Sequence, residues 1–72
     1  MRTYLKDLRK QAGMNQTEVA KRLGMTQTNY SYIESGKTKN ISFQTLHDLG
    51  KMFGQKSNTI FEAEMRFLER NR

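Results

Sequence analysis

Uncharged polar side chains dominate residues 27–32, where amides and hydroxyls stand in place of the lysines and glutamates of an ordinary solvated helix face. Such side chains are mediocre helix formers, but they can donate and accept hydrogen bonds at the edges of bases. Gln27 is the leading candidate, because its amide can pair with both N6 and N7 of adenine. We therefore expect base contacts from Gln27, Thr28, Asn29 and Tyr32, and the alternative is an ordinary wet surface.

Cations and small polar groups follow this run. Residues 37–40 form a loop with two lysines, side-chain donors and free backbone N–H groups, a combination suited to binding phosphate oxygens. Gln16 is expected at the N-terminus of a helix, where the helix dipole and free N–H groups favour an anion. The predicted phosphate contacts are Gln16, Ser31, Ser35, Lys37, Thr38, Lys39 and Asn40. The alternative for the loop is a solvated connector.

Two short helices must position these side chains, and the first is predicted from Asn15 to Gly24. Asn15 can cap the helix while Glu18 reaches back to it, which forms a capping box. Val19, Ala20 and Leu23 recur on one face, and Gly24 can end the helix in the left-handed conformation.

The second of these helices is predicted from about Thr26 to Ser35, with Thr26 as its N-cap after a short turn. The spacing i, i+3, i+4 places Tyr30, Ile33 and Glu34 on one inward face. Two helices joined by so short a turn form a helix-turn-helix pattern.

A helix from about Thr3 to Ala12 is expected to precede this pair, and Gly13 is expected to stop it. Its buried stripe is predicted to comprise Leu5, Leu8, Arg9 and Ala12. Arg9 is therefore a charge on an apolar face, and Glu34 is its counterpart on the inward face of the later helix. We predict a partly buried Arg9–Glu34 ion pair, and the alternative is two separate surface charges.

Two further helices are predicted after the loop. Ser42 is expected to cap the first, in which Phe43, Leu46, Leu49 and Phe53 follow at helical spacing until Gly54 closes it. Gly50 lies within this helix at a cost in helix propensity, which indicates close packing against another helix. Thr59 and Glu62 predict a second capping box at the start of the last helix.

The apolar side chains of residues 59–70 cover an arc wider than one core can use. Ile60, Ala63 and Phe67 are predicted to pack within the domain. The predicted dimer interface comprises Phe61, Met65 and Leu68, because a large exposed apolar patch usually marks an interface. The alternative is that the whole arc belongs to the core of one chain.

Residues 15–37 resemble the helix-turn-helix of the Xre/Cro-like family, which includes the lambdoid phage repressors. The matching features are Gln16, Ala20, Gly24, Thr26-Gln27, Ile33-Glu34 and Gly36-Lys37, and the likeness covers about Leu5 to Gly54. The resemblance implies a five-helix lambda-repressor-like fold, a loop at 37–40 that lies along the DNA backbone, the Arg9–Glu34 pair, and a Gln16 that braces Gln27. Tyr30 departs from the family pattern, which usually has Ile or Val, so its hydroxyl needs a partner.

Composition favours one small basic domain. The chain has 72 residues, a formal net charge of +6, no cysteine and one histidine. All of the excess positive charge lies in residues 1–56, which favours a polyanionic partner for that part and a different role for the neutral tail. We expect no disulfide, metal site, membrane span or signal peptide, and hence an intracellular protein.

The predicted fold is therefore all-α, a single five-helix domain over residues 1–72 in which residues 57–72 contribute to dimerisation. The predicted function is binding of double-stranded DNA as a homodimer at an inverted-repeat operator, with repression of transcription favoured. The protein is expected in the cytoplasm, associated with the nucleoid, and encoded by a bacterium or a phage. The alternative is an antitoxin-type DNA-binding protein whose C-terminal helix binds a different protein. An enzyme is disfavoured because the sequence lacks a glycine-rich phosphate loop and a spaced carboxylate set, so we expect neither a cofactor nor a small-molecule substrate.

Overall fold

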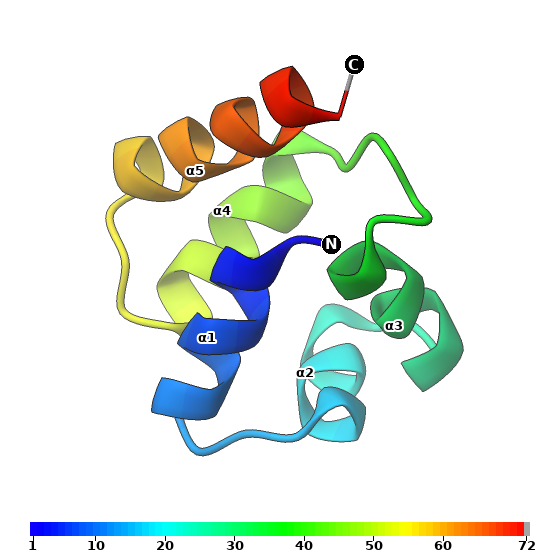
Figure 1. Cartoon of the computed structure of the whole chain (residues 1–72). Coiled ribbons are helices and arrows are strands. Elements are labelled where there is room, and N and C mark those ends of the chain that lie inside the picture. The colour runs from blue at the N-terminus through cyan, green and yellow to red at the C-terminus, as the bar shows by residue number, and fades with distance from the viewer. Residues whose placement is uncertain (72) are drawn as a thin grey trace. The chain divides into compact units, whose positions relative to one another are not determined.

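Five helices account for the regular structure of residues 1–71, the part of the chain that the computed structural model describes. They are α1 (Thr3–Gln11), α2 (Gln16–Leu23), α3 (Gln27–Ser35), α4 (Phe43–Met52) and α5 (Ser57–Arg70) (Figure 1). The predicted all-α fold with five helices is confirmed. The chain divides into two units, Met1–Lys39 and Asn40–Arg72. Within residues 1–71, none of the helices combines the length and the apolar content that crossing a membrane requires.

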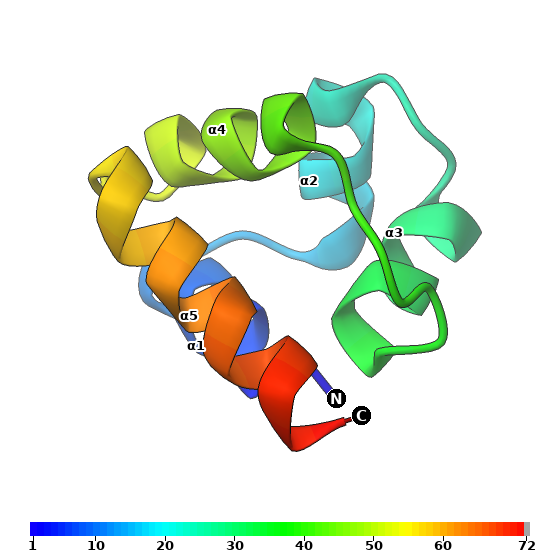
Figure 2. The same cartoon turned by 90° about the horizontal axis from the view of Figure 1, so that it is seen from above.

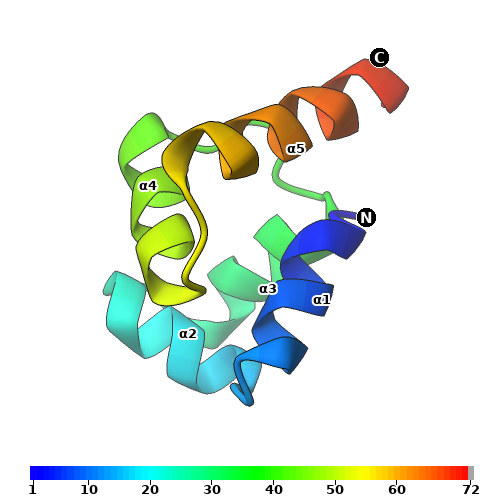
Figure 3. The same ribbon diagram turned by 90° about the vertical axis from the view of Figure 1, so that its left-hand side faces the viewer.

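In the first unit, α2 and α3 lie side by side and α3 also contacts α1 (Figures 1 and 3). The predicted capping box is present, since Asn15 Oδ1 accepts from the Glu18 amide at 2.8 Å and Glu18 Oε1 accepts from the Asn15 amide at 3.0 Å. Gly24 ends α2 in the left-handed conformation with φ of 70°. Thr26 Oγ1 then accepts from the Asn29 amide at 3.1 Å, so α3 begins directly after the turn.

The buried side chains of the first unit come from all three of its helices. They include Leu5, Val19, Ala20, Tyr30 and Ile33, which places the predicted inward face of α3 in the core. Ala12 was predicted on the buried stripe of α1, and this is wrong. The helix ends at Gln11 and Ala12 is its exposed C-cap, because the backbone already turns there toward Gly13.

In the second unit, α4 and α5 pack against each other (Figure 2). Ser42 caps α4 as predicted, with its Oγ accepting from the Thr45 amide at 3.1 Å. Gly50 makes the predicted close approach, because a Cβ at this position would lie 3.4 Å from Ile60 Cγ2 of α5. Phe43 was predicted to continue the apolar side of α4, but it is 76% exposed and meets Phe61 edge-on at 5.4 Å between ring centroids.

The start of α5 differs from the prediction. No capping box forms at Thr59 and Glu62, because the helix begins at Ser57 and Thr59 already lies inside its first turn. Lys56 is the N-cap and makes no side-chain cap hydrogen bond. The Ile60 amide donates to Lys56 O at 3.2 Å, and burial of Ile60 against Gly50 keeps this earlier start in place.

Candidate nucleic-acid interface

The outward side of α3 carries the residues that were expected to contact bases. Gln27, Thr28 and Asn29 are exposed in its first turn, and Tyr32 is 38% exposed one turn later. The cap at Thr26 fixes where this turn begins, and the buried ring of Tyr30 holds the opposite side of the helix in the core. All four residues predicted to contact bases are thus exposed on α3.

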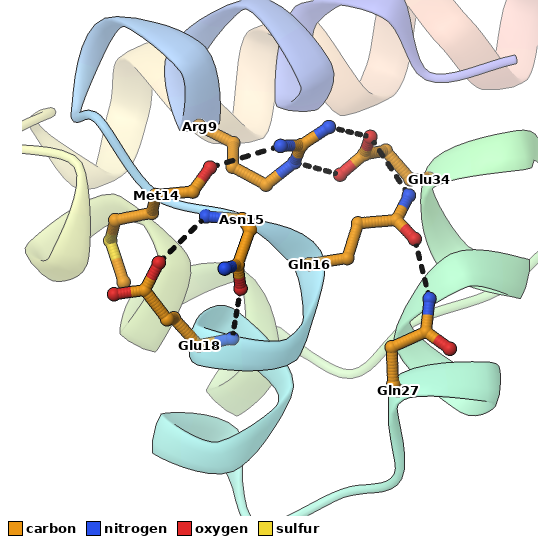
Figure 4. Close-up of polar contacts among 7 residues, drawn as sticks. All are labelled: Arg9, Met14, Asn15, Gln16, Glu18, Gln27 and Glu34. Carbon is orange, nitrogen blue, oxygen red and sulfur yellow. Dashed lines mark hydrogen bonds and ion pairs between the residues drawn. The ribbon is translucent and has the colours of Figure 1, made fainter.

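A chain of polar contacts holds Gln27 in place (Figure 4). Gln27 Nε2 donates to Gln16 Oε1 at 2.8 Å, and Gln16 Nε2 donates to Glu34 Oε1 at 3.3 Å. An amide nitrogen has two hydrogens and its oxygen has two lone pairs, so Gln27 keeps capacity for an outside partner while one contact orients it. Gln16 therefore braces Gln27, as the family resemblance implies.

The same chain of contacts ends on an ion pair between α1 and α3. Arg9 Nε lies 2.9 Å from Glu34 Oε2, and Arg9 Nη2 donates to Glu34 Oε1 at 2.9 Å, so the pair is bidentate (Figure 4). Arg9 Nη1 also donates to Met14 O at 3.0 Å. The two side chains are 12% and 4% exposed. The pair that the sequence predicts is thus present and largely removed from water.

Both charges of the pair are favoured by their surroundings. The hydrogen bond to Glu34 raises the pKa of Arg9. Burial alone would raise the pKa of Glu34, but hydrogen bonds, above all from Arg9, hold that pKa below its usual value. Glu34 is consequently an ionised acceptor that can orient both Arg9 and Gln16.

Tyr30 shows a cost of placing a ring in this core. Burial, followed by the nearby Glu34 carboxylate, raises the pKa of its hydroxyl. The hydroxyl is fully buried next to the Glu34 carboxylate, but among residues 1–71 it makes no hydrogen bond of ordinary geometry. The ring thus fits an otherwise aliphatic position by shape, and Glu34 is the polar neighbour of its hydroxyl.

The segment after α3 is tied back onto the helix. Gly36 adopts φ of 89°, the Lys37 amide donates to Ser35 Oγ at 3.3 Å, and the Thr38 amide donates to Tyr32 O at 3.1 Å. The prediction that Lys37 and Thr38 offer free backbone N–H groups is therefore wrong, because the turn uses both. Phosphate contact at these two positions has to come from side chains.

The predicted phosphate-contact residues are distributed as follows. Ser35, Lys37 and Lys39 are exposed, whereas Gln16, Ser31 and Thr38 are half-buried, all of them in the first unit; Asn40 is exposed and begins the second unit. Lys37 Nζ lies 4.2 Å from the centroid of the Tyr32 ring, which is a cation–π contact. This contact joins a residue predicted to bind phosphate to one predicted to contact bases.

Sequence reasoning missed Arg2, which has 0% exposure. Its guanidinium donates to Ile33 O at 2.7 Å, to Thr38 O at 2.6 Å and to Lys39 O at 2.6 Å. A cation near a chain terminus is normally expected to be loose in solvent, and no local pattern marks this one as buried.

The last helix separates its apolar side chains into two sets. Ile60 and Phe67 are buried, and Ala63 is half-buried. Phe61 and Leu68 are half-buried while Met65 is 56% exposed, and together with Phe43 these three line a groove of the second unit. We call Phe43, Phe61, Met65 and Leu68 the apolar face. The three residues predicted for a dimer interface thus lie on it.

Comparison with known proteins agrees with this geometry. A model of the helix-turn-helix family matches residues 5–57. The chain is 34% identical over 61 residues to a protein of Archaeoglobus fulgidus named as an uncharacterized HTH-type transcriptional regulator, and the match covers 85% of this chain and 84% of that protein. No solved structure gives a significant match. The relative is archaeal, so it gives no support to the expected bacterial or phage origin.

Proposed function

Because this chain belongs to the helix-turn-helix family, we propose that it regulates transcription as a homodimer that inserts α3 into the major groove of an inverted-repeat operator. That it is a DNA-binding regulator of transcription, and not an enzyme, follows from the family and from the relative. The dimer, the operator symmetry and repression are the parts that we add.

The observation that carries the proposal is the exposed first turn of α3, in which Gln27 is held by Gln16 at 2.8 Å. In helix-turn-helix proteins the N-terminal residues of the second helix lie nearest the bases. An amide whose orientation is already fixed loses less freedom when it pairs with an adenine edge. Thr28, Asn29 and Tyr32 add hydrogen bonds and apolar contact with a thymine methyl group.

Phosphate contacts complete the interface. Lys37 and Lys39 are exposed cations that follow α3 directly, and Gln16 opens α2, where the helix dipole favours an anion. Ser31, Ser35 and Thr38 add small polar groups next to them. Such contacts set the register of a protein on the duplex without reading sequence.

A two-fold dimer places its two recognition helices about one turn of DNA apart, roughly 34 Å. The exposed Met65 of α5, flanked by the half-buried Phe61 and Leu68, supports self-association. The operator is then an inverted repeat, and repression follows if it overlaps a promoter.

Selection of bound DNA from a random pool tests the proposal, because it returns the site, its symmetry and the half-site spacing together. We expect an enriched inverted repeat with half-sites about 10 base pairs apart. A pool that yields no enriched motif at moderate ionic strength contradicts the proposed sequence recognition.

Two substitutions then separate the proposed roles. Gln27→Ala is expected to cost about 1–3 kcal/mol on the selected operator and nothing on random DNA, because only a base contact is lost. Lys39→Ala is expected to weaken binding to both DNAs alike. It is also expected to reduce the salt slope, which is the slope of the logarithm of the binding constant against the logarithm of salt concentration, by about 1 per subunit. Gln11→Ala and Lys51→Ala, at exposed positions outside the proposed interface, are the matched controls. Equal losses on both DNAs for Gln27→Ala contradict its role as a base contact.

A further inference from the structure

The N-terminal segment of the first unit ends against the C-terminus of α3 (Figures 1 and 2). The Arg2 amide donates to Glu34 O at 2.8 Å, and Arg2 Nη1 donates to Ile33 O at 2.7 Å. One residue therefore supplies two donors to carbonyl groups in the last turn of α3.

A positive charge would stabilise the C-terminal end of α3. The last carbonyl groups of a helix lack partners within the helix and carry the negative end of its dipole. The last turn of α3 contains no basic residue. Arg2, although it lies more than thirty residues earlier in the chain, brings a positive charge to this end in a position with 0% exposure.

The same guanidinium also holds the segment that follows α3. Arg2 Nη1 donates to Thr38 O and Arg2 Nη2 donates to Lys39 O, both at 2.6 Å. The amides of Lys37 and Thr38 bond in turn to Ser35 Oγ and Tyr32 O. The segment is thus fixed to the end of α3 through its carbonyls and its amides at once.

We infer that Arg2 is a positioning residue for DNA binding, because its buried guanidinium sets where Lys37 and Lys39 lie relative to α3. The planar guanidinium presents a rigid fork of donors to several carbonyls, whereas a lysine is a compact charge on a flexible stem. The DNA-binding part of this inference rests on the proposed function, while the ordering of the 36–39 segment does not.

The DNA test compares Arg2→Lys and Arg2→Met with wild type on the selected operator and on random DNA. We expect both variants to bind about tenfold more weakly to both DNAs, with a salt slope reduced by about 2 per subunit, because the two lysines lose their fixed positions. The ratio of operator to random affinity stays at the wild-type value, since the first turn of α3 is unchanged. Lys10→Met, on the exposed side of α1, controls for the loss of one charge.

Three results overturn the inference. Arg2→Lys that binds with wild-type affinity and slope shows that charge alone matters. A changed ratio of operator to random affinity shows that Arg2 acts on the base-reading turn. Weaker binding with an unchanged salt slope means that the variant is only less stable and that fewer molecules are folded. That result also contradicts a positioning role.

A measurement without DNA separates this inference from the proposed function. Hydrogen exchange of the Thr38 amide, which donates to Tyr32 O, is expected to accelerate at least tenfold in Arg2→Lys, while the amides inside α2 exchange as in wild type. An unchanged Thr38 rate overturns the inference even if DNA binding is normal. If wild-type protein binds no DNA, the proposed function fails and the exchange rate still decides whether Arg2 orders the segment.

Discussion

Glu34 is the residue on which the polar contacts of all three helices of the first unit converge. It accepts from Arg9 of α1 and from Gln16 of α2, and Gln16 in turn accepts from Gln27 at the start of α3. A buried carboxylate is therefore connected to the side chain proposed to read bases. Removal of one member of a buried ion pair leaves the other without compensation, which typically costs about 3–5 kcal/mol.

The lowered pKa of Glu34 predicts how stability depends on pH. A folded-state pKa below the usual 4.5 means that the ionised carboxylate stabilises the fold above about pH 5, and that this contribution is lost as pH falls through the folded pKa. Glu34→Gln lacks the contribution, so we expect it to be less stable than wild type by about 3 kcal/mol at pH 7 and by progressively less below pH 4.5.

Urea unfolding of both proteins between about pH 7 and pH 3 measures this difference. Glu69→Gln, at an exposed position of α5, is the control and should follow wild type throughout. A stability difference between Glu34→Gln and wild type that is independent of pH would be incompatible with an ionised Glu34 as the source.

At the scale of elements, side-chain caps decide where α2, α3 and α4 begin, in accordance with local sequence, whereas packing decides where α5 begins. Asn15, Thr26 and Ser42 each accept a hydrogen bond from an amide three residues later. For α5 the position of Ile60 against Gly50 takes precedence, so the helix starts without a side-chain cap. A buried apolar contact contributes more than the roughly 1 kcal/mol that a cap supplies.

Two alanine substitutions test this account of the helix ends. Ser42→Ala removes an observed cap and is expected to lower the free energy of unfolding by about 1 kcal/mol. Thr59→Ala lies in the first turn of α5, where no cap bond exists, and is expected to change it by less than about 0.5 kcal/mol. Thermal or urea unfolding of the two variants gives the comparison. A loss at Thr59 equal to that at Ser42 would mean that Thr59 does cap α5 in solution.

For the whole molecule, charge and apolar surface are divided along the chain. The excess of Lys and Arg lies in residues 1–56, whereas residues 57–72 hold equal numbers of acidic and basic residues, and α5 carries most of the apolar face. A small chain with such a face gains stability from association, because the second copy removes apolar area from water. We therefore propose that the first unit contacts DNA and that the apolar face mediates self-association.

Replacement of Met65 and Leu68 together by glutamine tests that assignment. Glutamine keeps length and helix propensity but adds a polar amide, so the dimer is expected to dissociate at concentrations where wild type is dimeric. Sedimentation measures the mass, and Arg66→Gln, on the polar side of α5, is the control. A dimer that survives the double substitution contradicts the assignment. A monomeric wild type that needs a different protein to bind DNA favours the antitoxin alternative instead.

Features that depend on near neighbours in the chain were predictable from the sequence. The five helices, the caps at positions 15, 26 and 42, the turn at Gly24 and the inward face of α3 all follow from residues within about four positions of each other. The Arg9–Glu34 pair was also predictable, because a charge on each of two apolar faces needs a partner.

Only the tertiary structure decided the features that join distant residues. Arg2 meets carbonyl groups 31 to 37 residues away, and no local pattern reports such a contact. Four other features also depend on which segments pack nearby. They are the burial of the Tyr30 hydroxyl, the hydrogen-bonded amides of the segment after α3, the exposure of Phe43 and the early start of α5. Local propensity is set by the backbone of a few residues, whereas burial and hydrogen-bond partners are set by whichever segments the fold brings together.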